Sequence, residues 1–416
     1  MSSEWPLIKL NELCLKITDG AHQSPKSVTT GKPMASVKDL TRFGVDLSNA
    51  RLISEEDFNV LIKQGCKPEV GDVLIAKDGN SALDTVCSVD TELDAVLLSS
   101  VAILRPDKSK ILTNYLKHYL SSADVIDYLK SNFISGAAIP RVVLKDFKKA
   151  DIRVPPLPEQ EAIASVLEAL DSRIKVLRET NATLEAIAQA LFKSWFVDFD
   201  PVRAKVEGIE PQGMDAPTAA LFPDSFEESE LGLVPKGWKV GKVEDVMDLP
   251  YGKALKSTDR VVGVVPVYGS GGITGYHNES LVDGPSIIIG RKGTVGSLYW
   301  EDRPFFPIDT VFYVKAKQPL TYCYYLLQTL GLEGMNTDGA VPGLNRNNAY
   351  RLQVTVPSAP ALQAFDEIVA DVREKIFANS QQAETLTQLR DTLLPRLISG
   401  QLRLSEAEQT VEEVLA

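Results

Sequence analysis

The sequence has few of the residues on which metal and disulfide chemistry depend. Its 416 residues include four cysteines and three histidines. The cysteines form no Cys-x-x-Cys pair, and the histidines lie far apart, at His22, His118 and His277. Metal sites and disulfide frameworks need clustered ligands or paired thiols. We therefore expect no metal site, and a reduced, cytoplasmic environment for the chain.

Long hydrophobic runs are also missing. Hydrophobic residues make up 44% of the chain, but no run reaches the roughly 18 apolar residues that a membrane span requires. The first ten residues, MSSEWPLIKL, lack the basic and then apolar pattern of a secretory signal. We expect a protein that does not contact a membrane.

An excess of positive charge, the usual mark of a nucleic-acid-binding chain, is lacking as well. The formal net charge is −12. This acidity is uneven, because residues 1–155 and 237–357 carry net charges of 0 and +1, whereas 206–236 and 358–416 carry −6 and −5. Near-neutral domains bind DNA only weakly by themselves, so most phosphate contacts would have to come from a basic partner.

Two long stretches have the heptad pattern of paired helices. Apolar residues recur at alternating steps of three and four from Leu167 to Trp195, with a polar interruption at Asn181. Adding 202 to each number gives a second stretch, from Val369 to Leu397, without a gap. A helix over 159–196 would span about 57 Å at roughly 1.5 Å per residue. That length would hold two domains about 34 Å apart, which is one turn of DNA.

The two polar residues of these seams carry a register prediction. Asn181 lies at an a-type heptad position, and Asn379 at a d-type position. In an antiparallel helix pair, a and d positions meet. We therefore predict that Asn181 faces Asn379 and fixes the register of the pair. The alternative is two unrelated, solvated asparagines.

Each long stretch follows a segment of similar plan. Residues 76–79 correspond to 290–293, 138–140 to 340–342, and 152–155 to 354–357. Chance similarity would not restore the same order of features. The sequence therefore predicts a tandem duplication of a mixed helix-and-strand domain followed by a long helix.

Several motifs resemble those of one known family, the specificity subunits of type I restriction–modification systems. Residues 191–202 (LFKSWFVDFDPV) are similar to the end of the central conserved region of these subunits. The remaining similar motifs are 19–22 (DGAH), 155–160 (PPLPEQ), 221–226 (LFPDSF), 230–232 (ELG), 235–238 (PKGW) and 393–400 (LLPRLISG). The resemblance covers essentially the whole chain, and its helix and linker motifs are more specific than its domain motifs.

The resemblance implies an α+β fold. Two similar, mixed α/β target-recognition domains would be separated by a long antiparallel two-helix coiled coil, as a pseudo-two-fold tandem repeat. It implies a non-catalytic chain that binds double-stranded DNA, each domain reading one half of a bipartite site. The implied partners are two modification subunits, which methylate adenine with S-adenosylmethionine, and two restriction subunits, which use ATP and Mg²⁺. No cofactor is expected on this chain itself.

Together, the repeat and the resemblance divide the chain into six segments. These are a first recognition domain (1–156), a first helix (157–200), a Pro- and acid-rich linker (201–236), a second recognition domain (237–358), a second helix (359–400) and an acidic tail (401–416). Five prolines in the linker forbid a continuous helix there. The tail ends in glutamates, and we expect it to be frayed.

Candidate DNA contacts in the first domain lie in three loops. Arg, Lys, Asn and Gln read base edges, and hydroxyl side chains contact phosphates. The candidates are His22, Gln23, Ser24 and Lys26 in one loop, Lys77 and Asn80 after the strand predicted over 73–76, and Arg141 after the 138–140 turn. For His22, a loop histidine with a purely structural role is an equal alternative.

The second domain offers corresponding candidates. Tyr268, Ser270 and Tyr276 lie in a glycine-rich segment that could form a backbone nest for phosphate, with a structural turn as the alternative. Arg291, Lys292 and Thr294 match Lys77, Asp78 and Asn80, which suggests a shared DNA-facing loop rather than a simple hairpin. A polar cluster of Asn345, Arg346 and Asn347 follows the 340–342 turn.

Three other functions are considered. An adenine methyltransferase needs an Asn/Asp-Pro-Pro-aromatic motif, but the one Pro-Pro pair, at 155–156, follows valine and precedes leucine. A nuclease needs clustered acids, and Asp72 with Lys77 lacks a second acid nearby. The remaining alternative is a coiled-coil scaffold that carries two protein-binding domains and binds no DNA.

Overall fold

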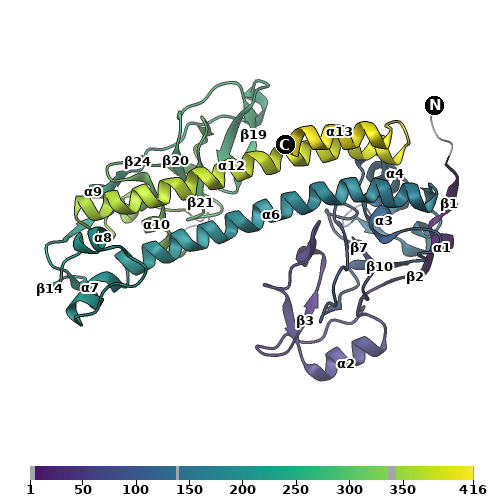
Figure 1. Cartoon of the computed structure of the whole chain (residues 1–416), viewed down its shortest axis with the longest axis horizontal. Coiled ribbons are helices and arrows are strands. Elements are labelled where there is room, and N and C mark those ends of the chain that lie inside the picture. Colours follow the sequence, from purple (N-terminus) through teal and green to yellow (C-terminus); the bar gives the residue numbers. More distant parts are fainter. Residues whose placement is uncertain (1–4, 137–139, 336–342, 416) are drawn as a thin grey trace. The chain divides into compact units, whose positions relative to one another are not determined.

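Two 40-residue helices, α6 (Leu157–Phe196) and α12 (Ala359–Ile398), are the long elements that the heptad pattern predicts (Figure 1). The structure is a computed structural model and describes residues 5–136, 140–335 and 343–415. Its contacts group the chain into two units. Unit 1 comprises Met1–Arg178 and Gln381–Ala416, and unit 2 comprises Glu179–Ser380. Each long helix therefore contributes one half to each unit.

Unit 1 combines small, mostly antiparallel sheets with helices. Its four-stranded sheet has the order β2-β10-β7-β8, and a three-stranded sheet has the order β6-β3-β9, in which β3 and β9 are parallel. The strands are β1 (Leu7–Lys9), β2 (Cys14–Asp19), β3 (Lys32–Ala35), β4 (Leu40–Thr41), β5 (Gly44–Val45), β6 (Arg51–Ile53), β7 (Val73–Ala76), β8 (Val86–Ser88), β9 (Val96–Leu97), β10 (Val101–Pro106), β11 (Ile134–Ser135), β12 (Arg141–Val142) and β13 (Asp151–Arg153). The α-helices besides α6 and α12 are α1 (Leu10–Leu13), α2 (Glu55–Lys63), α3 (Thr113–Leu120), α4 (Ala123–Phe133), α5 (Leu144–Phe147) and α13 (Leu404–Leu415), and a 3-10 helix, η1, spans Val37–Asp39.

Unit 2 has the same pairing plan. A three-stranded sheet has the order β21-β20-β23, and another, β19-β18-β22, again contains one parallel pair, β18 with β22. The strands are β14 (Phe226–Ser229), β15 (Gly232–Pro235), β16 (Lys239–Lys242), β17 (Met247–Asp248), β18 (Val265–Gly269), β19 (Gly272–His277), β20 (Ser286–Gly290), β21 (Leu298–Glu301), β22 (Phe306–Pro307), β23 (Val311–Tyr313), β24 (Lys315–Ala316) and β25 (Gln353–Val356). Its own helices are α7 (Asp200–Val206), α8 (Ala216–Ala220), α9 (Val243–Val246), α10 (Leu320–Thr329) and α11 (Arg346–Tyr350).

The topology shows the predicted duplication. In unit 1 the first strand, β1, pairs antiparallel with the last, β13, and in unit 2 β16 pairs in the same way with β25. The chain is therefore an α+β tandem repeat. The corresponding turns at 138–139 and 340–342 lie outside the described residues.

Burial explains why both helices keep their heptad pattern. In unit 1, Leu167, Leu170 and Ile174 are fully buried with Leu386 of α12 in one core. Complete burial of such a side chain contributes about 1.5–3 kcal/mol. The start of α6 is fixed by the buried Gln160, which accepts a hydrogen bond from Leu112 N and donates to Pro155 O and Lys110 O.

The motif at 191–202 belongs to an aromatic core in unit 2. Phe192, Trp195 and Phe196 are buried near the end of α6 and pack with Phe365 of α12 and Trp238. The linker joins this core, because Val202 of α7 and Phe222 after α8 are buried in it. As the prolines predict, the linker forms no continuous helix, but it folds into α7, α8 and the β14–β15 hairpin.

The expected fraying of the tail is wrong. Residues 404–415 form α13, and Ala407 and Val411 are buried in the unit 1 core, with Leu404 partly buried beside them. These positions recur at steps of three and four, so they lie on one face of a helix. The prediction of a frayed tail rested on the glutamates, which lie on the solvated face of α13, and did not take this short apolar face into account.

Candidate nucleic-acid interface

The loop after β7 in unit 1 is tied to the start of β12. Lys77 N donates a hydrogen bond to Ser100 O, Val142 N donates to Lys77 O, and Gly79 N donates to Pro140 O. Asp78 and Arg141 face each other in an isolated β-bridge. The structure therefore brings the loop of Lys77 and Asn80 to Arg141, which lies more than 60 residues further along the sequence.

The charges around this loop form two ion pairs, Lys77 with Asp19 and Arg141 with Asp78. The pairs are linked, because Lys77 Nζ also lies 3.9 Å from Asp78 Oδ1. Lys77 is only 6% exposed, and its Nζ lies 2.9 Å from Asp19 Oδ2. The other oxygen of Asp19 lies 3.1 Å from His22 Nε2. Arg141 Nε donates to Asp78 Oδ1 at 3.1 Å. Lys77 thus acts inside the domain, fixing the Asp19–His22 turn, and is not part of the exposed candidate surface.

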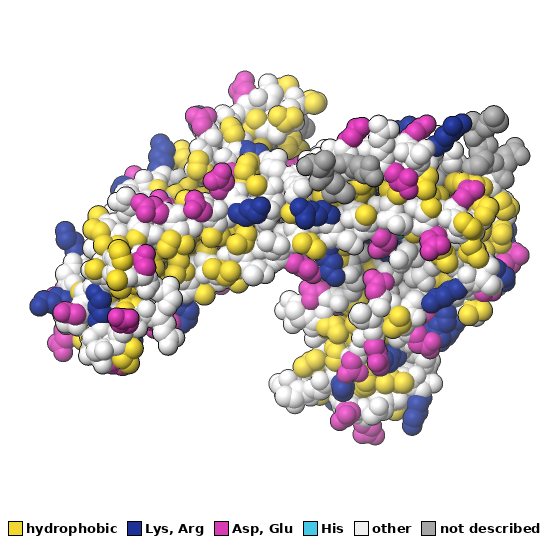
Figure 2. Space-filling view, viewed as in Figure 1, with side chains coloured by type: hydrophobic (Ala, Val, Ile, Leu, Met, Phe, Trp, Pro, Cys, Tyr) yellow, Lys and Arg dark blue, Asp and Glu magenta, His cyan; other side chains and the backbone are white. Residues whose placement is uncertain are grey.

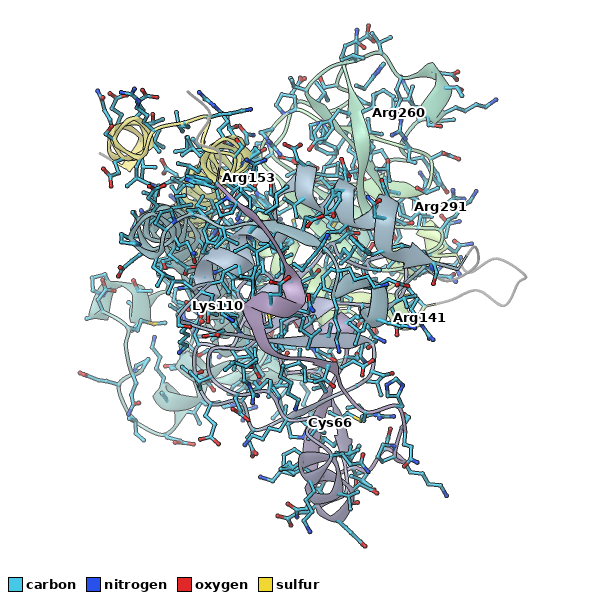
Figure 3. The ribbon with its side chains drawn as sticks, turned by 90° about the vertical axis from the view of Figure 1, so that its right-hand side faces the viewer. Cys66, Lys110, Arg141, Arg153, Arg260 and Arg291 are labelled. Carbon is cyan, nitrogen blue, oxygen red and sulfur yellow. The ribbon has the colours of Figure 1, made fainter. Side chains whose placement is uncertain are left out.

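The exposed side of the cluster is formed by Arg141, His22 and Asn80. The Arg141 side chain is 63% exposed and is labelled in Figure 3. Its Nε bond to Asp78 restrains the guanidinium and leaves the two Nη groups available for an acceptor. Gln23, Ser24 and Lys26 are also exposed. Ser24 Oγ accepts a hydrogen bond from Arg51 Nη1 at 2.8 Å, so the half-buried Arg51, which sequence reasoning missed, contacts this loop.

The nuclease alternative has no support in this geometry. Asp72 is buried and forms a two-point hydrogen bond with Arg105, at 2.8 and 2.9 Å, while Lys77 pairs with Asp19. Asp72 and Lys77 therefore serve separate structural ion pairs. No group of three His, Cys, Asp or Glu side chains within the described residues could hold a metal ion.

The loop after β20 in unit 2 repeats the unit 1 geometry. Arg291 N donates to Thr310 O, Leu344 N donates to Arg291 O, and Lys292 forms an isolated bridge with Gly343. These bonds correspond to those of Lys77 with Ser100 and Val142, and to the bridge between Asp78 and Arg141. The predicted match between the two loops is therefore present in the backbone hydrogen bonds.

The side chains around the second loop differ from those around the first. The guanidinium carbons of Arg291 and Arg346 lie 4.9 and 4.7 Å from the ring centroid of Tyr251. Tyr251 is 44% exposed, and Figure 3 labels Arg291. Sequence reasoning missed Tyr251, because it lies 40 residues before Arg291 in the sequence and only the fold brings the two together. A tyrosine followed by glycine after a Leu-Pro pair was the available signal.

The glycine-rich segment contains one core residue and one turn. Tyr268 is 6% exposed, and its hydroxyl donates to Glu301 Oε2 at 2.8 Å, so it belongs to the core rather than to the candidate surface. Ser270 lies in the turn between β18 and β19, and its carbonyl accepts a hydrogen bond from Ser297 Oγ at 2.6 Å. This bond joins the turn to the loop after β20. Tyr276 is exposed on β19.

The polar cluster at 345–347 begins helix α11. Asn345 Oδ1 accepts a hydrogen bond from Asn347 N at 2.9 Å, which caps the helix. The cap makes Arg346 the first helical residue. Asn347, Lys292 and Thr294 are exposed.

The surface mixes charges of both signs, and three of the thiols are protonated by burial. Figure 2 shows acidic and basic side chains interspersed over the face that it draws. Burial raises the pKa of the thiols of Cys14, Cys87 and Cys323 to about 12, so these thiols remain protonated near neutral pH. Among the described helices, none is long and apolar enough to span a membrane.

Comparison with known proteins gives consistent matches. A family model described as "Type I restriction modification DNA specificity domain" matches residues 2–186 and 235–391. The HindI specificity subunit of Haemophilus influenzae is 26% identical, over 76% of this chain and 83% of that subunit. The MjaIX specificity subunit of Methanocaldococcus jannaschii is 25% identical, over 72% and 71%. The crystal structure of a type I restriction–modification S subunit from M. genitalium has a similar fold, with a TM-score of 0.57, 20% identity and coverage of 95% and 96%.

Proposed function

The chain belongs to the type I restriction–modification DNA specificity family, and we propose that it selects the DNA sequence on which a type I complex acts. Each unit reads one half of a bipartite site in double-stranded DNA. The chain is non-catalytic by itself and directs adenine methylation or ATP-dependent cleavage by its partners.

The duplicated loop cluster is the observation that carries this proposal. In each unit a loop follows a buried strand, β7 or β20, and is hydrogen-bonded to the segment that begins near residue 141 or 343. Each cluster presents arginine, Arg141 in unit 1 and Arg291 with Arg346 in unit 2, and arginine is the commonest reader of base edges. Two equivalent clusters in one chain support two half-sites rather than a single continuous one.

The division of charge supports a role for partner subunits. The two domains are near neutral, so few phosphates can be neutralised by this chain alone. We assign the missing phosphate contacts to two modification subunits, which dock on the acidic helices α6 and α12 and bind S-adenosylmethionine. Two restriction subunits supply the ATP- and Mg²⁺-dependent steps. The helices set the spacing between the half-sites.

Two measurements test the proposal. In cells that carry this chain and its modification partner, methylome sequencing should reveal a split adenine-methylation motif with a fixed gap. Fluorescence anisotropy of the reconstituted complex with duplex DNA should show preference for that motif. If the complex binds all duplexes equally and no motif appears, the alternative of a scaffold with two protein-binding domains is favoured.

A further inference from the structure

Three side chains from separate segments of unit 2 meet at one aromatic ring. Arg291 follows β20, Arg346 begins α11, and Tyr251 lies on an isolated bridge with Phe312 of β23. The ring of Tyr251 also packs against that of Phe312, with centroids 5.0 Å apart. The residue after Tyr251 is Gly252, where an added Cβ would lie 2.2 Å from Ile308 O. The Tyr-Gly sequence thus allows the chain to approach closely enough to hold this ring in place.

Within residues 5–136, 140–335 and 343–415, the two guanidinium groups have no acidic partner. Elsewhere in unit 2, the guanidinium of Arg373 pairs with Glu185, and that of Arg303 with Glu301. No carboxylate among the described residues lies within ion-pair distance of Arg291 or Arg346. Because both lie within 5 Å of the same ring centroid, their charges are within about 10 Å of each other and repel. The site is therefore electrostatically suited to a ligand that supplies hydrogen-bond acceptors.

Arg346 is the better placed of the two to meet such a ligand. Arg291 already donates from Nη1 to Asp309 O at 3.2 Å. Within the described part of the chain, no hydrogen bond of the Arg346 side chain is seen; its Nε is buried, so the two Nη groups are the donors that a ligand could meet. Its guanidinium lies 4.7 Å from the ring centroid of Tyr251 and 5.7 Å from that of Tyr350, so two rings restrain it.

A restrained guanidinium suits the edge of guanine, and other side chains of the same loop can serve phosphate. Its planar fork donates two parallel hydrogen bonds, which fit O6 and N7 of guanine in the major groove. Phosphate binding places weaker demands on orientation, and the exposed Lys292 and Thr294 of the same loop can serve it. Resting on the function proposed above, we infer that Arg346 reads a guanine in the half-site of unit 2, with Tyr251 as its positioning residue.

The test compares Arg346→Ala, Arg346→Lys and the control Arg351→Ala, each in the full chain with its modification partner. Arg351 is an exposed arginine at the end of the same helix. Methylome sequencing gives the motif of each variant, and thermal melting verifies folding. Replacing residues 237–357 with a domain of another specificity identifies the half-site that belongs to unit 2.

Both Arg346 variants should lose discrimination at one guanine of that half-site by about 5- to 150-fold, while the other half stays intact. Lysine keeps the positive charge but lacks the planar pair of N–H donors of the guanidinium, so Arg346→Lys should discriminate as poorly as Arg346→Ala. Tyr251→Phe should keep the motif, and Tyr251→Ala should relax it at the same position. Arg351→Ala should leave the motif unchanged.

An unchanged motif in the folded Arg346→Ala variant would overturn the inference, whether methylation stays normal or falls uniformly as for a lost phosphate contact. Relaxation in the other half would overturn it too. If the unsubstituted chain yielded no split motif, the proposed function itself would fail.

Discussion

Asn379 of α12 donates a hydrogen bond from Nδ2 to Oδ1 of Asn181 on α6, at 2.9 Å. Asn181 in turn donates to Ile376 O at 3.1 Å and to Ser380 Oγ at 2.9 Å. Asn379 is only 4% exposed. Within unit 2, the two helices therefore meet at a polar pair. They run antiparallel, because Glu185, which follows Asn181 on α6, pairs with Arg373, which precedes Asn379 on α12.

We predict that the two asparagines stabilise the register only as a pair. Asn379→Leu leaves the amide of Asn181 facing an apolar side chain, which should cost about 1–3 kcal/mol. The double variant Asn181→Leu/Asn379→Leu should recover most of that loss, since a buried polar pair contributes to specificity more than to stability. Urea denaturation of the four proteins in a double-mutant cycle measures this coupling. Additive losses would show that the asparagines act independently.

The buried charges of unit 1 give a second prediction. Asp171 Oδ1 accepts a hydrogen bond from Arg390 Nη1 at 2.8 Å, and both side chains are buried. Arg42 Nε lies 3.4 Å from the same carboxylate. Asp171→Asn leaves these guanidinium groups poorly compensated and should cost about 3–5 kcal/mol. Asp391→Asn removes an exposed partner of Arg390 and should cost under about 1 kcal/mol. Equal losses in urea denaturation would contradict this difference.

Stability should fall in two steps as the solution is acidified. Burial lowers the pKa of His118, so the folded protein keeps it neutral while the unfolded chain takes up a proton below about pH 6.5. Burial raises the pKa of Glu168, but its hydrogen bonds with His118 and Lys117 outweigh this effect and hold the pKa at about 2. The stabilisation from Glu168 is therefore complete above pH 4.5 and is lost as the pH falls towards 2.

His118→Gln tests the first of these steps. Glutamine can still donate a hydrogen bond to Glu168 but does not titrate. The decline in the urea midpoint between pH 7.5 and 5.5 should become shallower in this variant, while the decline below pH 4.5 persists. Parallel curves for the two proteins above pH 5 would show that His118 does not contribute.

The docking of α13 gives a further prediction. Val411 is 7% exposed in the unit 1 core, whereas Val414 on the same helix is exposed. Val411→Asp should lower the free energy of unfolding by about 2–3 kcal/mol, because an apolar contact is lost and a charge would be buried. Val414→Asp should change it by less than about 0.5 kcal/mol. Equal stability of the two variants in thermal melting would show that α13 does not pack against the unit 1 core.

Periodic features of the fold could be predicted from the sequence. The heptad pattern predicted both long helices and the contact between Asn181 and Asn379, because helix geometry fixes which positions share a face. The repeat matched the loop of Lys77 with that of Arg291, since both follow a buried strand. Local pattern and tertiary structure agree at these positions.

Features that depend on three-dimensional proximity could not be predicted. Nothing near Lys77 in the sequence indicates that Asp19 neutralises it, and nothing near Arg346 points to Tyr251. Tyr268 and Tyr276 look equivalent in the sequence, yet Tyr268 lies in the core and Tyr276 on the surface. Exposure and ion pairing at these residues are decided by chain segments far away in the sequence.

The most direct test of the central claim is an exchange of residues 1–155 for the corresponding domain of a subunit with another specificity. The methylation motif of the hybrid is then determined by methylome sequencing with the same modification partner. We predict that one half of the split motif changes while the other half keeps its bases. A change in both halves, or in neither, would contradict the assignment of one half-site to each unit.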